Sequence, residues 1–139
     1  MTTPAPLLDR LRDRGWRVTP QRRAVAEVLT GEHVHVTADE VLERARTVIP
    51  EISLATVYNT LGELVAMGEV LEVRASRGPV RYDPNVHTAH HHLVCTECGK
   101  LLDVTPTGVE NVGLSGAEAH GFVIDDVDVT FRGRCPDCA

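Results

Sequence analysis

The sequence lacks any apolar run long enough to cross a bilayer, which takes about 20 residues in a helix. Residues 1–6 also lack the basic and apolar pattern of a secretory signal. We therefore expect a cytoplasmic protein with no membrane partner. In that reducing compartment, paired cysteines are more often metal ligands than disulfides.

Signatures of metalloenzymes are missing as well. The chain contains no His-Glu-x-x-His motif. A zinc deaminase would need a histidine and a glutamate one residue apart and then Pro-Cys-x-x-Cys, whereas the last cysteine pair here reads Cys-Pro-Asp-Cys. The sequence therefore gives little support for a zinc enzyme, and we expect no enzymatic activity.

An overall excess of positive charge is absent too, because the formal net charge is −6. The charge is uneven, however: residues 1–86 carry 11 arginines against 12 acidic residues, and residues 87–139 carry 3 basic and 8 acidic residues. Arginines are concentrated in residues 10–23 and again at Arg74, Arg77 and Arg81. A local basic face matters more for DNA than the total charge, so the first part can still bind DNA.

Two Cys-x-x-Cys pairs stand out against these absences, namely Cys95/Cys98 and Cys135/Cys138. Each pair can hold one ion from a single turn, and two such turns complete the four-thiolate shell that structural zinc prefers. A thioredoxin-like redox pair is the alternative, but two matched pairs favour zinc.

Histidines gather next to the first cysteine pair, at His87, His90, His91 and His92, and two more lie at positions 33 and 35. Together with nearby carboxylates, these imidazoles could form more open nitrogen and oxygen sites. The occupancy of such sites depends on metal supply and on pH.

Before residue 70 the hydrophobic spacing predicts four helices, over about 4–14, 20–30, 38–49 and 54–67. Their N-caps are clearest at Thr19, Thr37 and Ser53, and Thr37 with Glu40 forms a capping box. A hairpin with a basic tip follows over 70–83, which completes the pattern of a winged helix. The fourth predicted helix shows a polar face that suits the reading of bases. The expected readers on it are Thr56, Tyr58 and Asn59, with Thr60 and Glu63 on the same face.

The last third predicts strands at 93–95, 100–105 and 122–131, with a weak helix in 108–119. Such a unit buries little, so we expect it to rely on its zinc and on a partner subunit. The fold class is therefore α+β. We expect a winged-helix DNA-binding domain over 1–84, a hinge and metal-binding segment over 85–92, and a small zinc-stapled α/β dimerisation domain over 93–139.

Four stretches carry a family resemblance: RVTPQRRAVAEVL, SLATVYNTLGELVAMGEV, HHHLVCTECGKLLDV and the terminal CPDC. They are similar to the ferric uptake regulator family, and the likeness covers nearly the whole chain. It implies a homodimeric, metal-responsive repressor that binds double-stranded operator DNA.

The resemblance also implies roles for single residues. The structural zinc ligands of the family fall on Cys95, Cys98, Cys135 and Cys138, and the regulatory metal site falls on His35, Asp83, His90 and His92, with Asp103 as a further ligand. Glu110 matches a third site whose other ligands are replaced here, one of them by His91. Tyr58 falls where the recognition helix touches DNA, and Arg17 and Arg22 fall on basic positions used on DNA. Independently of the resemblance, Arg77 in the basic tip of the predicted hairpin is expected to contact DNA as well.

The regulatory metal is the open question at this point. His33, His87 and His91 exceed the common regulatory pattern, and extra imidazoles suit nickel better than a hard, oxygen-seeking ion. We therefore expect control of metal uptake and homeostasis genes by nickel, as in the nickel uptake regulators of actinobacteria. Asp83 also resembles the peroxide-sensing branch, so an iron- or manganese-dependent peroxide sensor or an iron-responsive repressor is the alternative. Metal storage is a more distant one.

Overall fold

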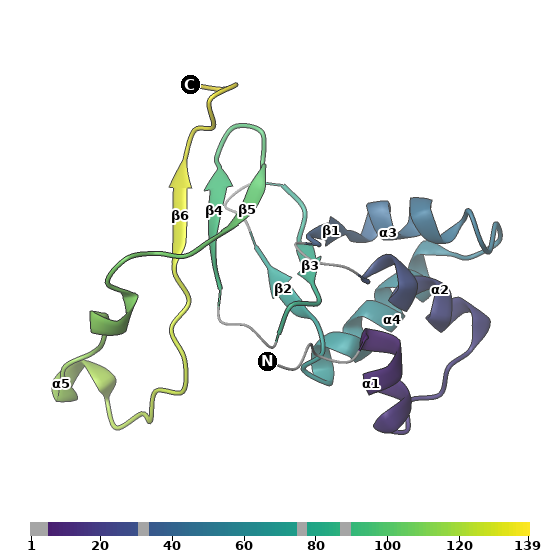
Figure 1. Cartoon of the computed structure of the whole chain (residues 1–139), viewed down its shortest axis with the longest axis horizontal. Helices are drawn as coiled ribbons and strands as arrows, with labels where there is room; N and C mark the ends of the chain where they lie inside the picture. The colour runs from purple at the N-terminus through teal and green to yellow at the C-terminus, as the bar shows by residue number, and fades with distance from the viewer. Residues whose placement is uncertain (1–5, 31–33, 75–77, 87–89) are drawn as a thin grey trace. The chain divides into compact units, whose positions relative to one another are not determined.

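The computed structural model describes residues 6–30, 34–74, 78–86 and 90–139. The chain divides into two compact units, Met1–Thr88 and Ala89–Ala139 (Figure 1). No helix among the described residues is long and apolar enough to cross a membrane.

The described part of the first unit forms four helices, and their starts follow the capping signals in the sequence. Their bounds are Leu7–Asp13 (α1), Pro20–Val28 (α2), Ala38–Ala45 (α3) and Leu54–Ala66 (α4). The side chains of Thr19, Thr37 and Ser53 each accept a hydrogen bond from a backbone N–H in the first turn, which confirms the predicted caps. The C-terminal ends are less well predicted: α3 ends at Ala45, four residues earlier than expected.

A small antiparallel sheet accompanies these helices. Its strands are Val36–Thr37 (β1), Leu71–Val73 (β2) and Arg81–Asp83 (β3), in the order β1-β3-β2. The predicted hairpin is therefore confirmed as β2 and β3. The sequence did not predict β1, because two residues are too short to show a period. Its pairing with β3, Val36 opposite Tyr82, joins the segment before α3 to the wing.

All four helices contribute side chains to one hydrophobic core. Its fully buried side chains include Leu11, Val25, Leu29, Val41, Ile52, Val57, Leu61 and Leu64. Thr60, which we expected on the polar face of α4, is only 3% exposed and its hydroxyl donates to the carbonyl of Thr56. Thr60 therefore belongs to the core side of the helix.

The second unit is a three-stranded sheet with little helix. Its strands are His91–Cys95 (β4), Leu101–Val104 (β5) and Thr130–Gly133 (β6), in the order β5-β4-β6, with β4 antiparallel to β5 and parallel to β6. The helix predicted over 108–119 forms only as a 3₁₀ turn at Val109–Asn111 and as Gly116–Ala119 (α5). Helix and sheet together give the expected α+β class.

The strand predicted over 122–131 is wrong for most of its length, because β6 begins only at Thr130. The alternating apolar residues before it are exposed, Phe122 by 77% and Ile124 by 50%. An alternating pattern predicts a half-buried strand only where a surface covers its apolar side. Among the described residues of this unit, the buried apolar side chains are Val94 and Cys95.

A buried ion pair joins the first helix of the first unit to the turn after α4. The carboxylate of Glu69, a residue only 7% exposed, accepts from Arg10 Nε at 3.1 Å and from Arg14 Nη1 at 2.9 Å. Burial alone would raise the pKa of Glu69, but the hydrogen bonds and charges of the two arginines outweigh it and hold the pKa below the ordinary value of 4.5.

We predict that Glu69→Gln lowers the free energy of unfolding of the first unit by about 2 kcal/mol near pH 7, because two charge-assisted hydrogen bonds weaken. A depressed pKa stabilises the fold above the unfolded value, and this contribution disappears as the pH falls through the folded value. The difference from wild type should therefore shrink below about pH 4.5. Urea unfolding followed by the fluorescence of Trp16, the single tryptophan, measures it.

The exposed pair Arg23–Glu27 provides the control, since Glu27→Gln removes a carboxylate from a solvated position. That variant should unfold like wild type. A Glu69→Gln deficit that is independent of pH would show that the ionised pair is not its source.

Candidate metal centres and DNA-reading face

The four cysteines come together at one end of the sheet in the second unit. Strand β4 ends at Cys95, and the turn after it places Gly99 at φ 77° before β5. Because β6 runs parallel to β4 with Gly133 opposite Cys95, the turn with the second cysteine pair starts beside the first. One sulfur from each of the four cysteines lies within 4.8 Å of all the others.

Hydrogen bonding divides these thiols into unequal classes. Cys95 Sγ accepts from the backbone N–H groups of Cys98 at 3.5 Å and Cys135 at 3.4 Å, which lowers the pKa of Cys95 to about 6. Hydrogen bonds among the thiols, first with Cys135 and then with Cys98, raise the pKa of Cys138 to about 12. A bound divalent cation favours the thiolate form of its cysteine ligands, and four sulfurs at this spacing fit zinc.

We predict that Cys135→Ser weakens zinc binding more than about 100-fold, because a hydroxyl replaces one of the four thiolate ligands. Loss of a residue that only supports a ligand usually weakens metal binding by less than this. Competition against a chelator, with the zinc content read by native mass spectrometry, measures the change. Asp137→Asn alters the exposed residue inside the same turn and should bind zinc like wild type. Full zinc affinity in Cys135→Ser would remove Cys135 from the ligand set.

In the first unit, one imidazole and one carboxylate form a buried pair. His35 Nε2 lies 3.2 Å from Oδ2 of Asp83, and the two side chains are 7% and 0% exposed. Asp83 Oδ1 accepts from the backbone N–H of Asn85 at 2.8 Å. A fully buried carboxylate against an imidazole is a donor set suited to a divalent transition metal.

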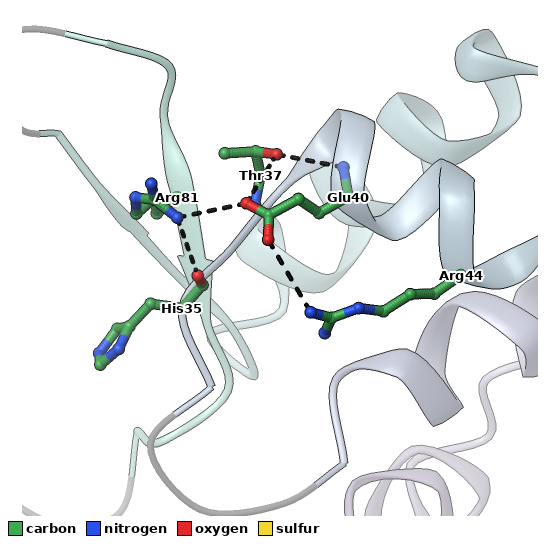
Figure 2. Close-up of polar contacts among 5 residues, drawn as sticks. All are labelled: His35, Thr37, Glu40, Arg44 and Arg81. Carbon is green, nitrogen blue, oxygen red and sulfur yellow. Dashed lines mark hydrogen bonds and ion pairs between the residues drawn. The ribbon is translucent and has the colours of Figure 1, made fainter. Parts of the chain in front are cut away.

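The backbone beside this pair is held by a network centred on Glu40 (Figure 2). Arg81 Nη1 donates to the carbonyl of His35 at 3.2 Å and to Glu40 Oε1 at 3.3 Å. The same carboxylate oxygen accepts from the backbone and the hydroxyl of Thr37. The His35 imidazole points away from these contacts, so the network holds the backbone of His35 while its Nε2 lies against Asp83. Arg81 therefore does not belong to the basic tip that the sequence predicted.

In the second unit, the strand pairing of β4 with β5 assembles another donor set. His92 lies opposite Asp103, and Asp103 Oδ1 is 3.4 Å from His92 Nε2 and 3.7 Å from His90 Nε2. The two imidazole rings meet edge to face, with centroids 4.8 Å apart. The three side chains are at most 12% exposed. Two imidazoles and one carboxylate thus converge without help from the cysteines.

The remaining predicted ligands fall elsewhere. His91 lies between two members of the set, so its side chain emerges on the other face of β4, where Nδ1 accepts from the backbone N–H of Val129 at 3.0 Å. That bond commits Nδ1 and argues against His91 as a ligand. Glu110 is exposed on the 3₁₀ turn and, within the described residues, joins no cluster of ligands. His33 and His87 lie outside the described residues.

The expected DNA readers on α4 differ in how available they are. Tyr58 is 51% exposed and Asn59 is exposed too, so both can reach a groove. Thr56 is only partly exposed and its hydroxyl bonds with that of Ser53 at 3.0 Å, which ties it to the helix cap. Arg17 is exposed, Arg22 is bound to other residues of the unit, and Arg77 lies outside the described residues.

The sequence identified the candidate metal ligands, but it did not reveal the contacts that position the surrounding residues. The capping box identified Glu40, whose contact with Arg81 spans 41 positions. The hydrogen bond between Trp16 and Glu63 was not predicted, because it joins positions 47 apart. Only a known helix packing could have brought them together.

Comparison with known proteins places this architecture in a class of metal-responsive transcriptional regulators. The sequence model of the ferric uptake regulator family matches residues 13–132. The transcriptional regulator FurA of Mycobacterium tuberculosis is 34% identical over 131 residues, which cover 94% of this chain and 88% of that protein. The peroxide operon regulator of Bacillus subtilis is 33% identical over 132 residues, with 95% and 90% covered.

A solved structure agrees with these relatives. The crystal structure of the Vibrio cholerae ferric uptake regulator has a TM-score of 0.75 and 27% identity, covering 91% of this chain and 98% of that one. The chain belongs to the ferric uptake regulator family.

Proposed function

We propose that this chain is a repressor that binds operator DNA as a homodimer when it is loaded with a divalent metal, and that the regulatory metal is nickel. The two buried imidazole and carboxylate sets carry this proposal. One is His35 with Asp83, and the other is His90 and His92 with Asp103.

Neither set completes a coordination shell by itself. The first unit offers one nitrogen and one carboxylate, and the second offers two nitrogens and one carboxylate. We propose that one ion takes ligands from both, since transition metals take four to six donors. Three imidazoles favour a borderline ion such as nickel, and His33 and His87 are further candidates on neighbouring segments.

Such an ion would restrict the hinge between the DNA-binding and dimerisation units. In a dimer, that restriction selects one spacing of the two recognition helices, and two half-sites about one helical turn apart require one particular spacing. A coupling of about 1–3 kcal/mol per effector changes affinity about 5- to 150-fold.

The second unit supplies the support for a homodimer. Its exposed large apolar side chains lie on the sheet and on the segments that follow β5, and they are Leu93, Leu102, Val112, Leu114, Phe122, Val123, Ile124 and Phe131. Exposed apolar side chains on a unit with a small core are suited to pack against a second copy of the chain in a dimer interface. We propose that zinc on the four cysteines holds this unit together for that contact.

On the DNA side, we propose that α4 enters the major groove with Tyr58 and Asn59 toward the bases. Arg17 would contact phosphate, because it is an exposed cation on the loop before α2.

We predict that nickel raises the affinity of the zinc-containing protein for DNA about 5- to 150-fold. The DNA is an operator duplex selected in vitro, and nickel, iron, manganese and zinc are titrated separately by fluorescence anisotropy. His92→Ala should abolish the response and keep the cysteine-bound zinc. His120→Asn, at an exposed histidine with φ 49°, should respond like wild type.

Equal affinity with and without each metal would refute the sensor. Absence of DNA binding in every metal state would favour metal storage. A response to iron or manganese but not to nickel would keep the sensor and reject the metal.

A peroxide-responsive repressor is the second candidate. The relatives include a peroxide operon regulator, and the same five side chains, with Asp83 as the buried carboxylate, could hold iron. In that case iron held by these side chains would promote oxidation of a ligand histidine by hydrogen peroxide: one peroxide oxygen would be added to the imidazole, and the other would leave as water.

Peptide mass spectrometry separates the two candidates. If nickel regulates the protein, peroxide treatment of the iron-loaded form should leave the masses of the peptides with His35 and His90 unchanged while DNA binding persists. The mass of one added oxygen on either histidine, together with loss of DNA binding, would favour the peroxide sensor.

A further inference from the structure

Arg22, which the family resemblance places on DNA, is already bound within the first unit. Its Nη1 donates to the carbonyl of Arg17 at 2.9 Å, and its Nη2 donates to Glu63 Oε1 at 2.9 Å. The centre of the guanidinium lies 4.9 Å from the ring centroid of Trp16, which is cation–π distance. The side chain is 28% exposed. Both terminal nitrogens of the Arg22 guanidinium therefore donate hydrogen bonds, and one face of its plane stacks on Trp16.

Glu63 completes this arrangement from α4. It is the charged residue of that helix, and both of its carboxylate oxygens are engaged, because Trp16 Nε1 donates to Oε2 at 3.0 Å while Arg22 binds Oε1. An unpaired carboxylate on a helix that approaches DNA would repel phosphate. The Arg22 guanidinium offsets this charge from within the protein.

The three side chains connect the parts of the unit proposed to contact DNA. Trp16 and Arg17 lie on the loop between α1 and α2, Arg22 lies in the first turn of α2, and Glu63 lies near the end of α4. Arg22 hydrogen-bonds both the carbonyl of Arg17 and the carboxylate of Glu63 on the recognition helix. Arg22 therefore links the backbone of the exposed Arg17 to that helix.

We infer that Trp16, Arg22 and Glu63 form a positioning clamp that fixes the recognition helix relative to Arg17, and that Arg22 is a positioning residue and makes no phosphate contact. This inference rests on the proposed DNA binding through α4. An exposed ion pair contributes little by itself, but an arginine that donates to two separate acceptors, stacks on Trp16 and is only 28% exposed restricts geometry as well. Specific binding needs that geometry, because base contacts require the helix in one register.

The sign of the Glu63→Ala effect tests the clamp. Removing a negative charge from a DNA-binding surface should by itself tighten binding, whereas loss of positioning should weaken it. We expect about tenfold weaker binding to the selected operator, within the range of couplings between contacting residues. Binding to a random duplex of equal length should not weaken. Glu27→Ala, the matched removal of an exposed acid, should bind the operator as well as wild type or slightly better.

Salt dependence supplies the second test. A phosphate contact contributes about 0.9 to the slope of log K against log salt concentration. We expect Arg22→Ala to bind the operator about tenfold more weakly with an unchanged slope. Arg17→Ala should lose about one unit of slope. The double variant Arg22→Ala/Glu63→Ala should be no weaker than either single variant, because both remove the same clamp.

All measurements use nickel-loaded, zinc-containing protein with thermal unfolding recorded alongside. Trp16→Phe keeps the ring for stacking and removes the N–H donor, so it tests the clamp even if Arg22→Ala unfolds. It should also weaken operator binding and leave random-duplex binding unchanged.

A shallower slope in Arg22→Ala combined with tighter binding in Glu63→Ala would overturn the inference, since Arg22 would then contact phosphate. Wild-type binding in every clamp variant would overturn it too. A wild-type protein that binds no DNA in any metal state would overturn the proposed function and the clamp together.

Discussion

The pairing of β1 with β3 is the constraint on which the first unit depends. Two residue pairs, Val36 with Tyr82 and Thr37 with Arg81, hold the segment before α3 against the wing. On one side this pairing places His35 beside Asp83, and on the other it leads directly into the capping box of α3. A ligand that shifts His35 or Asp83 would therefore also shift strands that are joined to the helical core. A donor pair on a flexible loop would not transmit that shift.

The two units reach stability in different ways, and this explains why the chain has two kinds of metal ligand. The first unit has a core from four helices, whereas the buried apolar side chains described in the second are Val94 and Cys95. A unit of that kind gains from a permanently bound ion, for which thiolates are suited. Imidazole and carboxylate ligands hold divalent transition metals less tightly than four thiolates do, so under the proposed function these two sets would suit an exchangeable ion.

Local chemistry could be predicted from the sequence, and long-range pairing could not. The caps at Thr19, Thr37 and Ser53 depend on neighbours within three residues, so their residue types were sufficient. Residues 122–131 have the alternation of a strand, but a strand needs a partner and a covered face, which lie elsewhere in the chain or in a second copy. Arg22 and Arg81 were counted as surface charges because their partners are 41 positions away in each case.

These internal ion pairs change how the electrostatics of the molecule should be understood. The fold uses much of its arginine internally: Arg10 and Arg14 bind Glu69, Arg22 binds Glu63, and Arg81 binds Glu40. A protein with a formal charge of −6 and its arginines so committed has little general attraction for phosphate. Low non-specific affinity is a condition for metal control, because a strongly basic surface would hold DNA in every state of the hinge. Under the proposed function, binding then depends on placing two recognition helices correctly, and the regulatory ion would control that placement.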